Sequence, residues 1–381
     1  MEKVYIARCN NYDIDNVKKS VYACMESFPE LKKKLTKGAR VLVKANLLMK
    51  KSPDEVTTTH PSVIEAIVRF VQDSGCKAII GDSPGGPFTV KSLQAIYTAT
   101  GMAEVAEKTG CELNYDITFS EVWDNNAKLL KSMKIINIAK QVDFIISAAK
   151  LKTHGMMTYT GAVKNLFGVV PGLTKAEYHF KMNNAENFAH HLIDICQHIK
   201  PAFSIIDGID GMEGNGPSSG DRIHAGLVLG STNPFALDTA AAHIIGMSTD
   251  AVPTIKAASE RGVFSGKISD VDIMGAALQE INVKPFKLPH SADINFVRNR
   301  VPRFIEKAIV KALRPSPVFD LEKCVSCGDC KRSCPPDVID MSSGKPVVDL
   351  SKCIRCFCCH ELCPKKAVDI KRHWIHEKLF K

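Results

Sequence analysis

Residues 324–335 read CVSCGDCKRSCP, and residues 353–364 read CIRCFCCHELCP. In each run, two residues separate the first three cysteines, three residues precede the fourth, and a proline follows it directly. Three thiolates on one tight loop can occupy three corners of a metal–sulfur cubane, whereas the fourth corner needs a cysteine from elsewhere in the chain. The two runs therefore predict the fold of the C-terminal part: a small α+β unit built around two metal–sulfur centres.

The spacing of both runs resembles that of the bacterial two-cluster ferredoxins, in which the fourth cysteine of each run binds the other cluster. We therefore predict two [4Fe–4S] clusters as cofactors. The first ligand set is Cys324, Cys327, Cys330 and Cys363. The second ligand set is Cys334, Cys353, Cys356 and Cys359. Zinc is the alternative, but zinc sites usually take two separated Cys-x2-Cys pairs, not two triplets that each have a trailing Cys-Pro.

Two residues in the second run stand outside this ligand pattern. Cys358 does not fit the repeat, and we expect it to pack as a small apolar residue and not as a ligand. His360 directly follows Cys359, and we expect it to be exposed or hydrogen-bonded and not a ligand.

The placement of the cysteines also indicates a cellular compartment. Nine of the 14 cysteines lie between Cys324 and Cys363, and the N-terminus lacks the pattern of a secretory signal. In a reducing compartment such a cluster binds metal far more often than it forms disulfides. No apolar run approaches the roughly 20 residues of a membrane-spanning helix. We expect a cytoplasmic protein with no transmembrane segment.

The net charge of +9 is confined to two short segments. Residues 284–318 carry an excess of six positive charges and residues 371–381 an excess of three, while the other parts are neutral. A nucleic-acid-binding domain would be basic across one folded face, so we expect no nucleic acid among the partners. We divide the chain into an α/β domain at 1–283, a basic linker at 284–317, a ferredoxin-like domain at 318–370 and a basic tail at 371–381.

Within the basic linker, residues 301–313 have apolar side chains at helical spacing with basic residues between them. We predict an amphipathic helix here, followed by a stiff hinge at Pro315-Ser316-Pro317. Two roles stay open for this helix. Its apolar stripe packs on the large domain, or the helix docks an acidic partner or an anionic membrane surface.

Residues 1–283 alternate apolar, β-rich runs with amphipathic stretches, which is the pattern of an α/β domain with a mostly parallel sheet flanked by helices. The predicted strands are Val4–Ala7, Ala39–Val43, Lys77–Gly81, Val142–Ala148, Ala202–Ile206 and Ala225–Gly230. The predicted helices include Val63–Asp73, Val90–Thr98, Glu186–Ile199 and Pro234–Ile245.

Polar or glycine-rich turns directly follow four of the predicted strands, at Lys44–Asn46, Gly81–Gly86, Lys150–His154 and Asp207–Pro217. Because the carboxyl ends of parallel strands meet at one edge of a sheet, we expect a binding site at that edge. The candidate catalytic residues are Lys150, Lys152, His154, Asp207 and Asp210. The candidate ligand-binding residues are Lys44, Asp82, Lys164, Gly214, Asn215 and Gly216.

The chemistry of these residues favours a small anionic ligand. Lysines suit a carboxylate, a phosphate or a developing oxyanion, and glycine turns let backbone amides approach an anion closely. Asp207 and Asp210 are candidate acid–base groups or metal ligands, or they only cap turns. No glycine-rich nucleotide motif is present, so nucleotide binding has no specific support. The alternative for each lysine is a solvated surface charge.

Several motifs, in order along the chain, resemble the iron–sulfur proteins of domain-of-unknown-function family 362, which are often fused to a two-cluster ferredoxin. The motifs are Val43–Asn46, Gly81–Gly86, Lys150–His154, Thr160–Gly168, Asp207–Pro217 and Ser231–Pro234 with Asp238. The resemblance spans about residues 3–280. It implies an iron–sulfur protein without implying a defined reaction.

Two classes of function follow from these features. In the first, the protein is an oxidoreductase that passes single electrons through the clusters to or from a small anionic substrate or cofactor held by the large domain. In the second, it is an electron carrier or binding protein that only docks a redox partner protein. A bound organic ligand favours the first class, and clusters alone favour the second.

Overall fold

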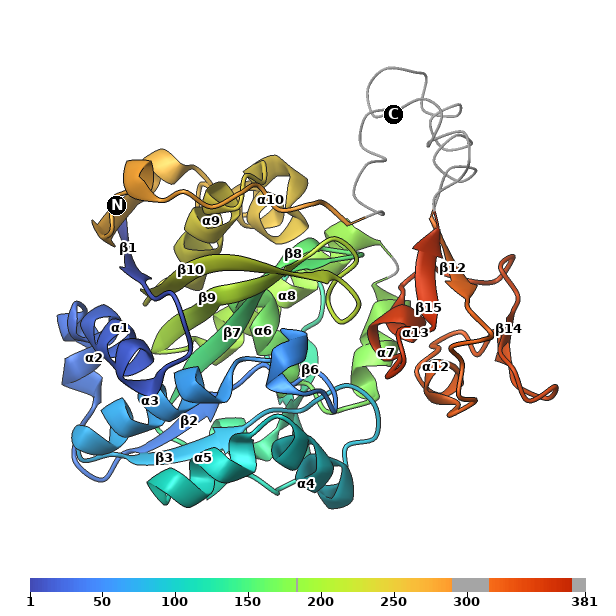
Figure 1. Ribbon diagram of the computed structural model, residues 1–381, viewed down its shortest axis with the longest axis horizontal. Coiled ribbons are helices and arrows are strands. Elements are labelled where there is room, and N and C mark those ends of the chain that lie inside the picture. Colours follow the sequence, from blue (N-terminus) through green and yellow to red (C-terminus); the bar gives the residue numbers. More distant parts are fainter. Residues whose placement is uncertain (183, 290–314, 372–381) are drawn as a thin grey trace.

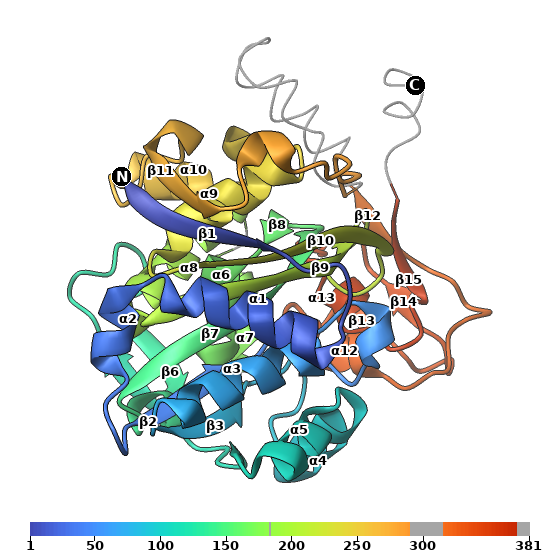
Figure 2. The same ribbon diagram turned by 60° about the vertical axis from the view of Figure 1, so that its left-hand side comes forward.

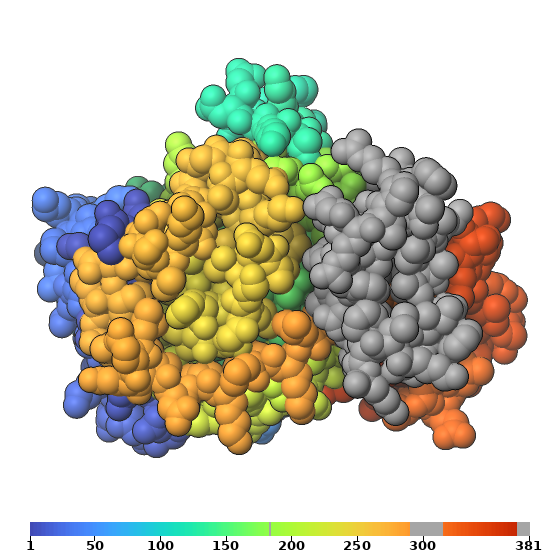
Figure 3. Space-filling model, turned by 90° about the horizontal axis from the view of Figure 1, so that it is seen from above, coloured from blue at the N-terminus to red at the C-terminus, as the bar shows by residue number. Residues whose placement is uncertain are grey.

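The computed structural model describes residues 1–182, 184–289 and 315–371, which form a large α/β domain and a small C-terminal module (Figure 1). The module lies at the opposite end of the molecule from the N-terminal elements, as the view from above shows (Figure 3). The predicted amphipathic helix of the basic linker lies outside the described residues.

The large domain is built on a nine-stranded sheet with the order β11-β1-β10-β9-β7-β2-β3-β4, and β8 pairs with β7. Its strands are β1 (Glu2–Arg8), β2 (Arg40–Lys44), β3 (Lys77–Gly81), β4 (Glu112–Leu113), β7 (Phe144–His154), β8 (Thr158–Thr160), β9 (Phe203–Glu213), β10 (Asp221–Ser231) and β11 (Val271–Gly275). Only β8 and β10 run against the others, so the prediction of a mostly parallel sheet is confirmed. A separate hairpin joins β5 (Phe119–Trp123) to β6 (Ser132–Ile136).

Helices cover both faces of this sheet (Figures 1 and 2). One layer contains α1 (Ile14–Glu26), α2 (Pro29–Lys34), α3 (Pro61–Asp73), α4 (Val90–Ala99) and α5 (Met102–Thr109). The other contains α6 (Ala162–Asn165), α7 (Thr174–Lys181), α8 (Ala185–Ile199), α9 (Pro234–Ile244) and α10 (Pro253–Glu260). Because side chains alternate along a strand, Val41 and Val43 pack in the first core and Leu42 in the second.

Two strands are longer than predicted, and this difference matters for the site. We placed Lys150–His154 and Asp207–Glu213 in turns, but β7 continues to His154 and β9 to Glu213. The turn prediction is wrong because these polar residues keep their sheet partners: Lys150 pairs with Asp207, and Lys152 pairs with Met212. Lys150, Lys152 and His154 therefore continue one face of β7, beyond its apolar part.

The C-terminal module consists of short elements around the cysteines. They are β12 (Ser316–Phe319), α12 (Asp329–Arg332), β13 (Ile339–Asp340), β14 (Val347–Val348), α13 (Cys358–Glu361) and β15 (Val368–Lys371). The predicted hinge residues Ser316 and Pro317 lie in β12, which pairs with β15 as a two-stranded sheet. Proline is tolerated there because the outer side of β12 needs no amide donor. The predicted domain boundary at 318 lies inside this strand.

Candidate functional site

The eight predicted ligand cysteines gather in two groups of four. Burial raises the pKa of the Cys330 thiol, and the nearby thiols of Cys327, Cys324 and Cys363 raise it further. In the same way, burial and the thiols of Cys356, Cys353 and Cys334 raise the pKa of Cys359. Cys330 also contributes to the raised pKa of Cys359; the other neighbours belong to the predicted ligand sets, and the assignment of each set to one cluster stays a prediction. A cavity of about 20 Å³ is lined by all four cysteines of the first set, and four thiolates are the donor set of a [4Fe–4S] cluster, so the residues present fit a cluster.

The backbone around the two groups is shaped to hold sulfur. Ser326 N–H donates to Cys324 Sγ and Arg355 N–H donates to Cys353 Sγ, each at 3.4 Å. Both donors have left-handed backbones, with φ of 57° and 59°. Amide donors to the ligand sulfurs are one of the means by which proteins set cluster potentials.

The two groups differ in where they lie. We name the site of Cys324, Cys327, Cys330 and Cys363 the outer site, because Cys327 is exposed. We name the site of Cys334, Cys353, Cys356 and Cys359 the inner site, because α13 packs beside the large domain near α7 (Figure 1).

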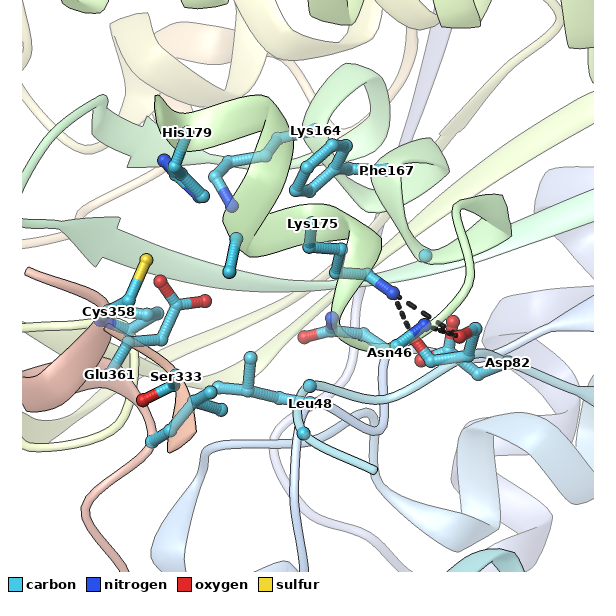
Figure 4. Close-up of a pocket in the computed structure, with 18 of the residues that line it drawn as sticks. Asn46, Leu48, Asp82, Lys164, Phe167, Lys175, His179, Ser333, Cys358 and Glu361 are labelled. Atoms are coloured by element: carbon cyan, nitrogen blue, oxygen red, sulfur yellow. Dashed lines mark hydrogen bonds between the residues drawn. The ribbon is translucent and has the colours of Figure 1, made fainter. Parts of the chain in front are cut away.

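A cavity of about 70 Å³ with an open mouth lies between the large domain and the inner site (Figure 4). From the module, Ser333, Cys358, Glu361 and Leu362 line it. Ser333 directly precedes Cys334, and Cys358 directly precedes Cys359. Both lining residues are therefore adjacent in sequence to predicted ligands of the same cluster, the one at the inner site.

Three lysines from the large domain line the cavity. Lys152, on β7, donates to Thr57 O at 2.6 Å. Lys175, on α7, donates to Ser83 O at 2.6 Å and also to Val170 O. Lys164, on α6, has no hydrogen-bond or salt-bridge partner among the described residues, and its ammonium group points into the cavity (Figure 4). Neutral carbonyl oxygens therefore hold two of the three cations, Lys152 and Lys175, whereas Lys164 lacks such a partner.

Burial lowers the pKa of each of these lysines. The pKa of Lys152 falls to about 7 because its ammonium is removed from water, and the charge of Lys164 lowers it further. The pKa of Lys175 also falls to about 7, again through burial. Burial lowers the pKa of Lys164 as well, although Glu361 opposes the shift. An anion in the cavity would reverse these shifts, since it favours the charged form of each lysine.

The ion pair of Lys44 and Asp82 supports the cavity wall. Lys44 Nζ lies 2.7 Å from Asp82 Oδ1, and both side chains are buried. Asp82 Oδ2 also accepts from Leu47 N–H at 2.8 Å. A Cβ on Gly168 would lie 2.1 Å from Asp82 Oδ1 and 2.3 Å from Lys44 Nζ, so only glycine leaves room for this pair. Asp82 lines the cavity, whereas Lys44 lies behind it and offsets its charge.

Glu361 carries a carboxylate from the module into the cavity. Burial alone would raise its pKa, but the charge of Lys164 and the neighbouring His154 more than offset this and lower it. His154 Nδ1 accepts from the N–H groups of Met156 and Met157, so Nε2 carries the proton and faces Glu361 Oε2 at 3.6 Å. His154 therefore lies behind Glu361, not on the cavity.

A buried aspartate fixes the helix that bears Lys164. Asp238, on α9, accepts from the N–H groups of Ala162 and Val163 and from Tyr159 OH. These amides are the unpaired donors at the start of α6, and a carboxylate satisfies them well. A Cβ on Gly161 would lie 2.2 Å from Asp238 Oδ1, which explains the glycine at this position. The Thr160–Gly168 motif thus sets the direction of Lys164.

The predicted glycine turn lies close to the lysine strand, as expected. Thr153 Oγ1 donates to Gly214 O at 2.8 Å, and Gly155 N–H donates to Gly216 O at 3.0 Å. The turn contacts the module and does not line the cavity: Asn215 O lies 3.0 Å from His360 Nε2. Pro217, the next residue, does line the cavity.

Three predicted catalytic residues lie away from the cavity. Lys150 Nζ donates to Asp207 Oδ2 at 2.9 Å and to Tyr12 OH at 2.8 Å, deep in the large domain. Asp210 pairs with the half-exposed side chains of Arg222 and His224. Each group is occupied by protein partners, so the structure does not join them to the cavity, and their catalytic role stays a prediction.

Among the residues of the cavity wall that sequence reasoning did not single out are Lys175, His179 and Glu361. Burial lowers the pKa of His179 to about 3, so its ring is neutral. The sequence contained a hint of the special role of Glu361. Cys358, His360 and Glu361 of the second cysteine run differ in chemical type from their counterparts in the first run. Lys175 and His179 had no such hint, since a surface helix and a cavity-lining helix share the same periodicity.

A pair of four-thiol sites in a small module docked on an α/β domain defines a ferredoxin-type iron–sulfur protein. Residues 316–364 match the family described as 4Fe-4S dicluster domain, and residues 41–243 match the family described as Domain of unknown function (DUF362). The chain belongs to this DUF362 family, which confirms the resemblance drawn from the motifs.

One relative is the thylakoid-associated protein sll1697 of Synechocystis sp., 31% identical over 294 residues that cover 76% of this chain and 88% of the relative. Among solved structures, the lactate racemase apoprotein from Thermoanaerobacterium thermosaccharolyticum aligns with a TM-score of 0.41 and 12% identity, over 64% of this chain and 57% of that one. A Thermotoga maritima protein aligns with a TM-score of 0.34 and 12% identity, over 52% and 51%. Similarity at this level carries no inference about activity.

Among the residues that the structure describes, no helix is both long and apolar enough to cross a membrane.

Proposed function

We propose that the protein is an iron–sulfur oxidoreductase that passes single electrons between two [4Fe–4S] clusters and a small anionic ligand bound in the cavity. The observation that supports this most strongly is the position of the cavity. Its walls include Ser333 and Cys358, each one residue from a ligand cysteine of the inner cluster. Electron transfer needs short distances, and a ligand in this cavity would lie against the inner cluster.

The eight cysteines would hold the clusters, Cys324, Cys327, Cys330 and Cys363 at the outer site and Cys334, Cys353, Cys356 and Cys359 at the inner site. When bound, each cluster supplies reversible one-electron chemistry. The exposed outer site is the natural contact for a redox partner protein, and the inner site faces the ligand. Because clustered cysteines bind metal mainly in reducing compartments, the cysteine-rich module supports our proposal that the protein is cytoplasmic.

The cavity residues divide into binding and positioning groups in this proposal. Lys152 and Lys164 would bind the anion, because both present donors to the cavity. Lys44 and Asp82 would hold the wall in place, and His154 would orient Glu361. Lys150, Asp207 and Asp210 would act indirectly, by fixing the β7 and β9 strands that carry Lys152 and the glycine turn.

The rival proposal is an electron carrier whose large domain has no chemistry of its own. The cavity beside the inner site favours the enzyme, because an electron carrier does not need a ligand cavity next to a cluster. Anaerobic purification, acid extraction and mass spectrometry decide between the two. An organic anion bound near one per chain supports the enzyme, and clusters without any ligand support the carrier.

A variant sharpens this test. Lys152→Ala should weaken binding of the extracted anion by about 1.5–3 kcal/mol, the cost of losing a hydrogen bond to a charged group. The iron content should not change, because the cysteines lie in the module. Lys134→Ala, on the surface strand β6, serves as the control. Unchanged binding in the Lys152 variant would remove this lysine from the site.

A further inference from the structure

The charges that line the cavity do not balance. Lys152, Lys164 and Lys175 face Asp82 and Glu361. Lys44 offsets Asp82 at 2.7 Å, and Glu361 offsets one further lysine. The two nearby histidines are neutral, because burial lowers the pKa of His154 to about 4 and that of His179 to about 3. When all of these lysines are protonated, two lysine charges therefore lack a counter-charge among the described residues.

Polar atoms without partners also point to a missing ligand. The ammonium of Lys164 has no hydrogen-bond partner in the described part of the chain, and it points into the cavity (Figure 4). Asn46 Oδ1 and His179 Nδ1 are buried without partners, and both residues line the same cavity. Buried polar groups are nearly always paired in native proteins, so these atoms around one space indicate a ligand. A carboxylate would accept from the Lys164 ammonium and from His179 when Nδ1 carries the ring proton, whereas Asn46 Oδ1 is an acceptor and needs a donor such as water.

Part of the wall is apolar. Leu48, Phe167 and Leu173 come from the large domain and Leu362 from the module. A fully polar anion such as inorganic phosphate would leave these surfaces against its hydration shell. An organic ligand with an apolar body covers them and gains the hydrophobic contribution of that contact.

We propose that this cavity binds a small organic dianion of the dicarboxylate type, with carboxylates at the lysines and an apolar body along Phe167 and Leu48. The inference rests on the proposed function, because it names the ligand class of the same site. Two carboxylates match the two unbalanced lysines, and a bound dicarboxylate has oxygens enough for Lys152 and Lys164 together.

The titration of the lysines supports the same ligand. The groups that face Lys152 are Lys164, Lys150, Glu361 and Asp82, and those that face Lys175 are Lys44, Lys164, Asp82 and Glu361. With pKa values of about 7, both lysines are partly neutral near pH 7 in the empty cavity. A dianion raises these pKa values, so binding takes up protons, and its affinity must fall as the pH rises above about 7.

The alternative is that the lysines only offset the negative charge of a thiolate-held cluster at the inner site. In that case the cavity needs no dianion, and removing a lysine changes the cluster potential without changing any binding.

Calorimetry on the anaerobic holoprotein tests the inference with two matched pairs of probes. Fumarate is compared with crotonate, and terephthalate with 4-methylbenzoate; in each pair a methyl group replaces one carboxylate. We expect at least one dianion to bind about tenfold tighter than its partner. Its binding heat should depend on the ionisation enthalpy of the buffer at pH 7.5, which reports proton uptake.

Variants assign the effect to the lysines. Lys164→Gln and Lys152→Gln should each reduce the preference for the dianion about tenfold and reduce the proton uptake. Lys164 makes no hydrogen bond or salt bridge to any described residue, so its replacement by glutamine should not prevent folding. Lys134→Gln, which pairs with Glu177 on the surface of α7, should change neither quantity.

The outcomes separate this inference from the proposed function. Equal binding of both members of each pair, or no binding of either dianion, overturns the dicarboxylate inference, and an extracted ligand of another class would leave the oxidoreductase proposal standing. Tight dianion binding that leaves the paramagnetic resonance of the reduced inner cluster unchanged would support the ligand class and count against the redox role.

Discussion

The two cysteine runs have the same spacing, yet they are placed in different environments. In the first run, Gly328 precedes α12, and Cys327 and Lys331 beside it are exposed. At the corresponding positions of the second run stand Phe357, Cys356 and His360, and Phe357 and His360 are buried. One half of the module therefore faces solvent, and the other faces the large domain.

The difference shows how one motif acquires two roles. The backbone needs a left-handed residue before each short helix, and Gly328 (φ 76°) and Phe357 (φ 61°) both supply it. Glycine adopts this conformation freely, whereas phenylalanine is strained by about 1–2 kcal/mol. Packing of the ring, which is 8% exposed, offsets that strain. The second cysteine run therefore differs from the first at the positions that face the large domain, Phe357 and His360.

The contacts at this boundary are few and specific. His360 Nε2 faces Asn215 O at 3.0 Å, and its Nδ1 faces Val368 O at 2.6 Å, which confirms that His360 is hydrogen-bonded. Ser218 Oγ donates to Glu361 O at 2.7 Å, and Lys51 Nζ donates to Pro364 O at 3.1 Å. A Cβ on Gly85 would lie 2.5 Å from the Leu362 side chain, so glycine permits this close approach.

The largest effect should come from replacing one ligand in each run. Cys327→Ser and Cys356→Ser should each lower the iron content from about eight to about four atoms per chain, because each removes one of the four ligands of one cluster. Only Cys356→Ser should disconnect the cavity ligand from the remaining cluster. Iron and sulfide analysis with paramagnetic resonance checks both statements. Stoichiometric zinc without broad visible absorbance would contradict the cluster assignment.

Docking of the module should depend on His360 and not on its counterpart Lys331. His360→Ala removes the bond to Asn215 O, so the module should loosen by about 1–3 kcal/mol. Hydrogen exchange of residues 214–220 should then become faster by about tenfold or more, while Lys331→Ala leaves it unchanged. Equal protection in both variants would show that the remaining contacts suffice.

Exchange at each of the two left-handed positions should lower stability, but for different reasons. Gly328→Ala introduces strain at an exposed site and should cost about 1 kcal/mol of stability. Phe357→Gly relieves strain but loses a buried ring, whose removal costs about 3–5 kcal/mol, so a net loss of about 2–3 kcal/mol is expected. Thermal unfolding of the anaerobic holoprotein measures both. A stabilised Phe357→Gly variant would mean that the ring contributes little to docking.

The smallest effect concerns Cys358 and its counterpart Asp329. The Cys358 thiol donates a hydrogen bond to Cys356, which lowers the pKa of the Cys356 thiol. Hydrogen bonds to ligand sulfur raise cluster potentials, so Cys358→Ala should lower the potential of the inner cluster and leave the iron content unchanged. A potentiometric titration measures this shift, with Asp329→Ala as the matched control. Loss of iron in Cys358→Ala would make Cys358 a ligand.

Most of the architecture could be predicted because it depends on local patterns. Cysteine spacing fixed the two ligand sets, since a short loop can present only a few corners to a cubane. Alternating apolar runs predicted the parallel sheet, and three of its strands, β1, β2 and β3, match their predicted ranges to within two residues at each end. The polar ends of β7 and β9 were assigned to turns, because sequence patterns do not show that Lys150 pairs with Asp207 in register.

The sequence by itself determined the two cluster motifs, the α/β domain and the gathering of lysines at one sheet edge. Only the tertiary structure decided which lysines share a cavity and which are already paired. Lys150 and Lys152 lie two residues apart on one face of β7, yet Lys150 is neutralised by Asp207 while Lys152 lines the cavity. Docking of the module completes that cavity with Cys358 and Glu361, about 200 residues away along the chain. Partners so distant in sequence are chosen by packing, which no local pattern records.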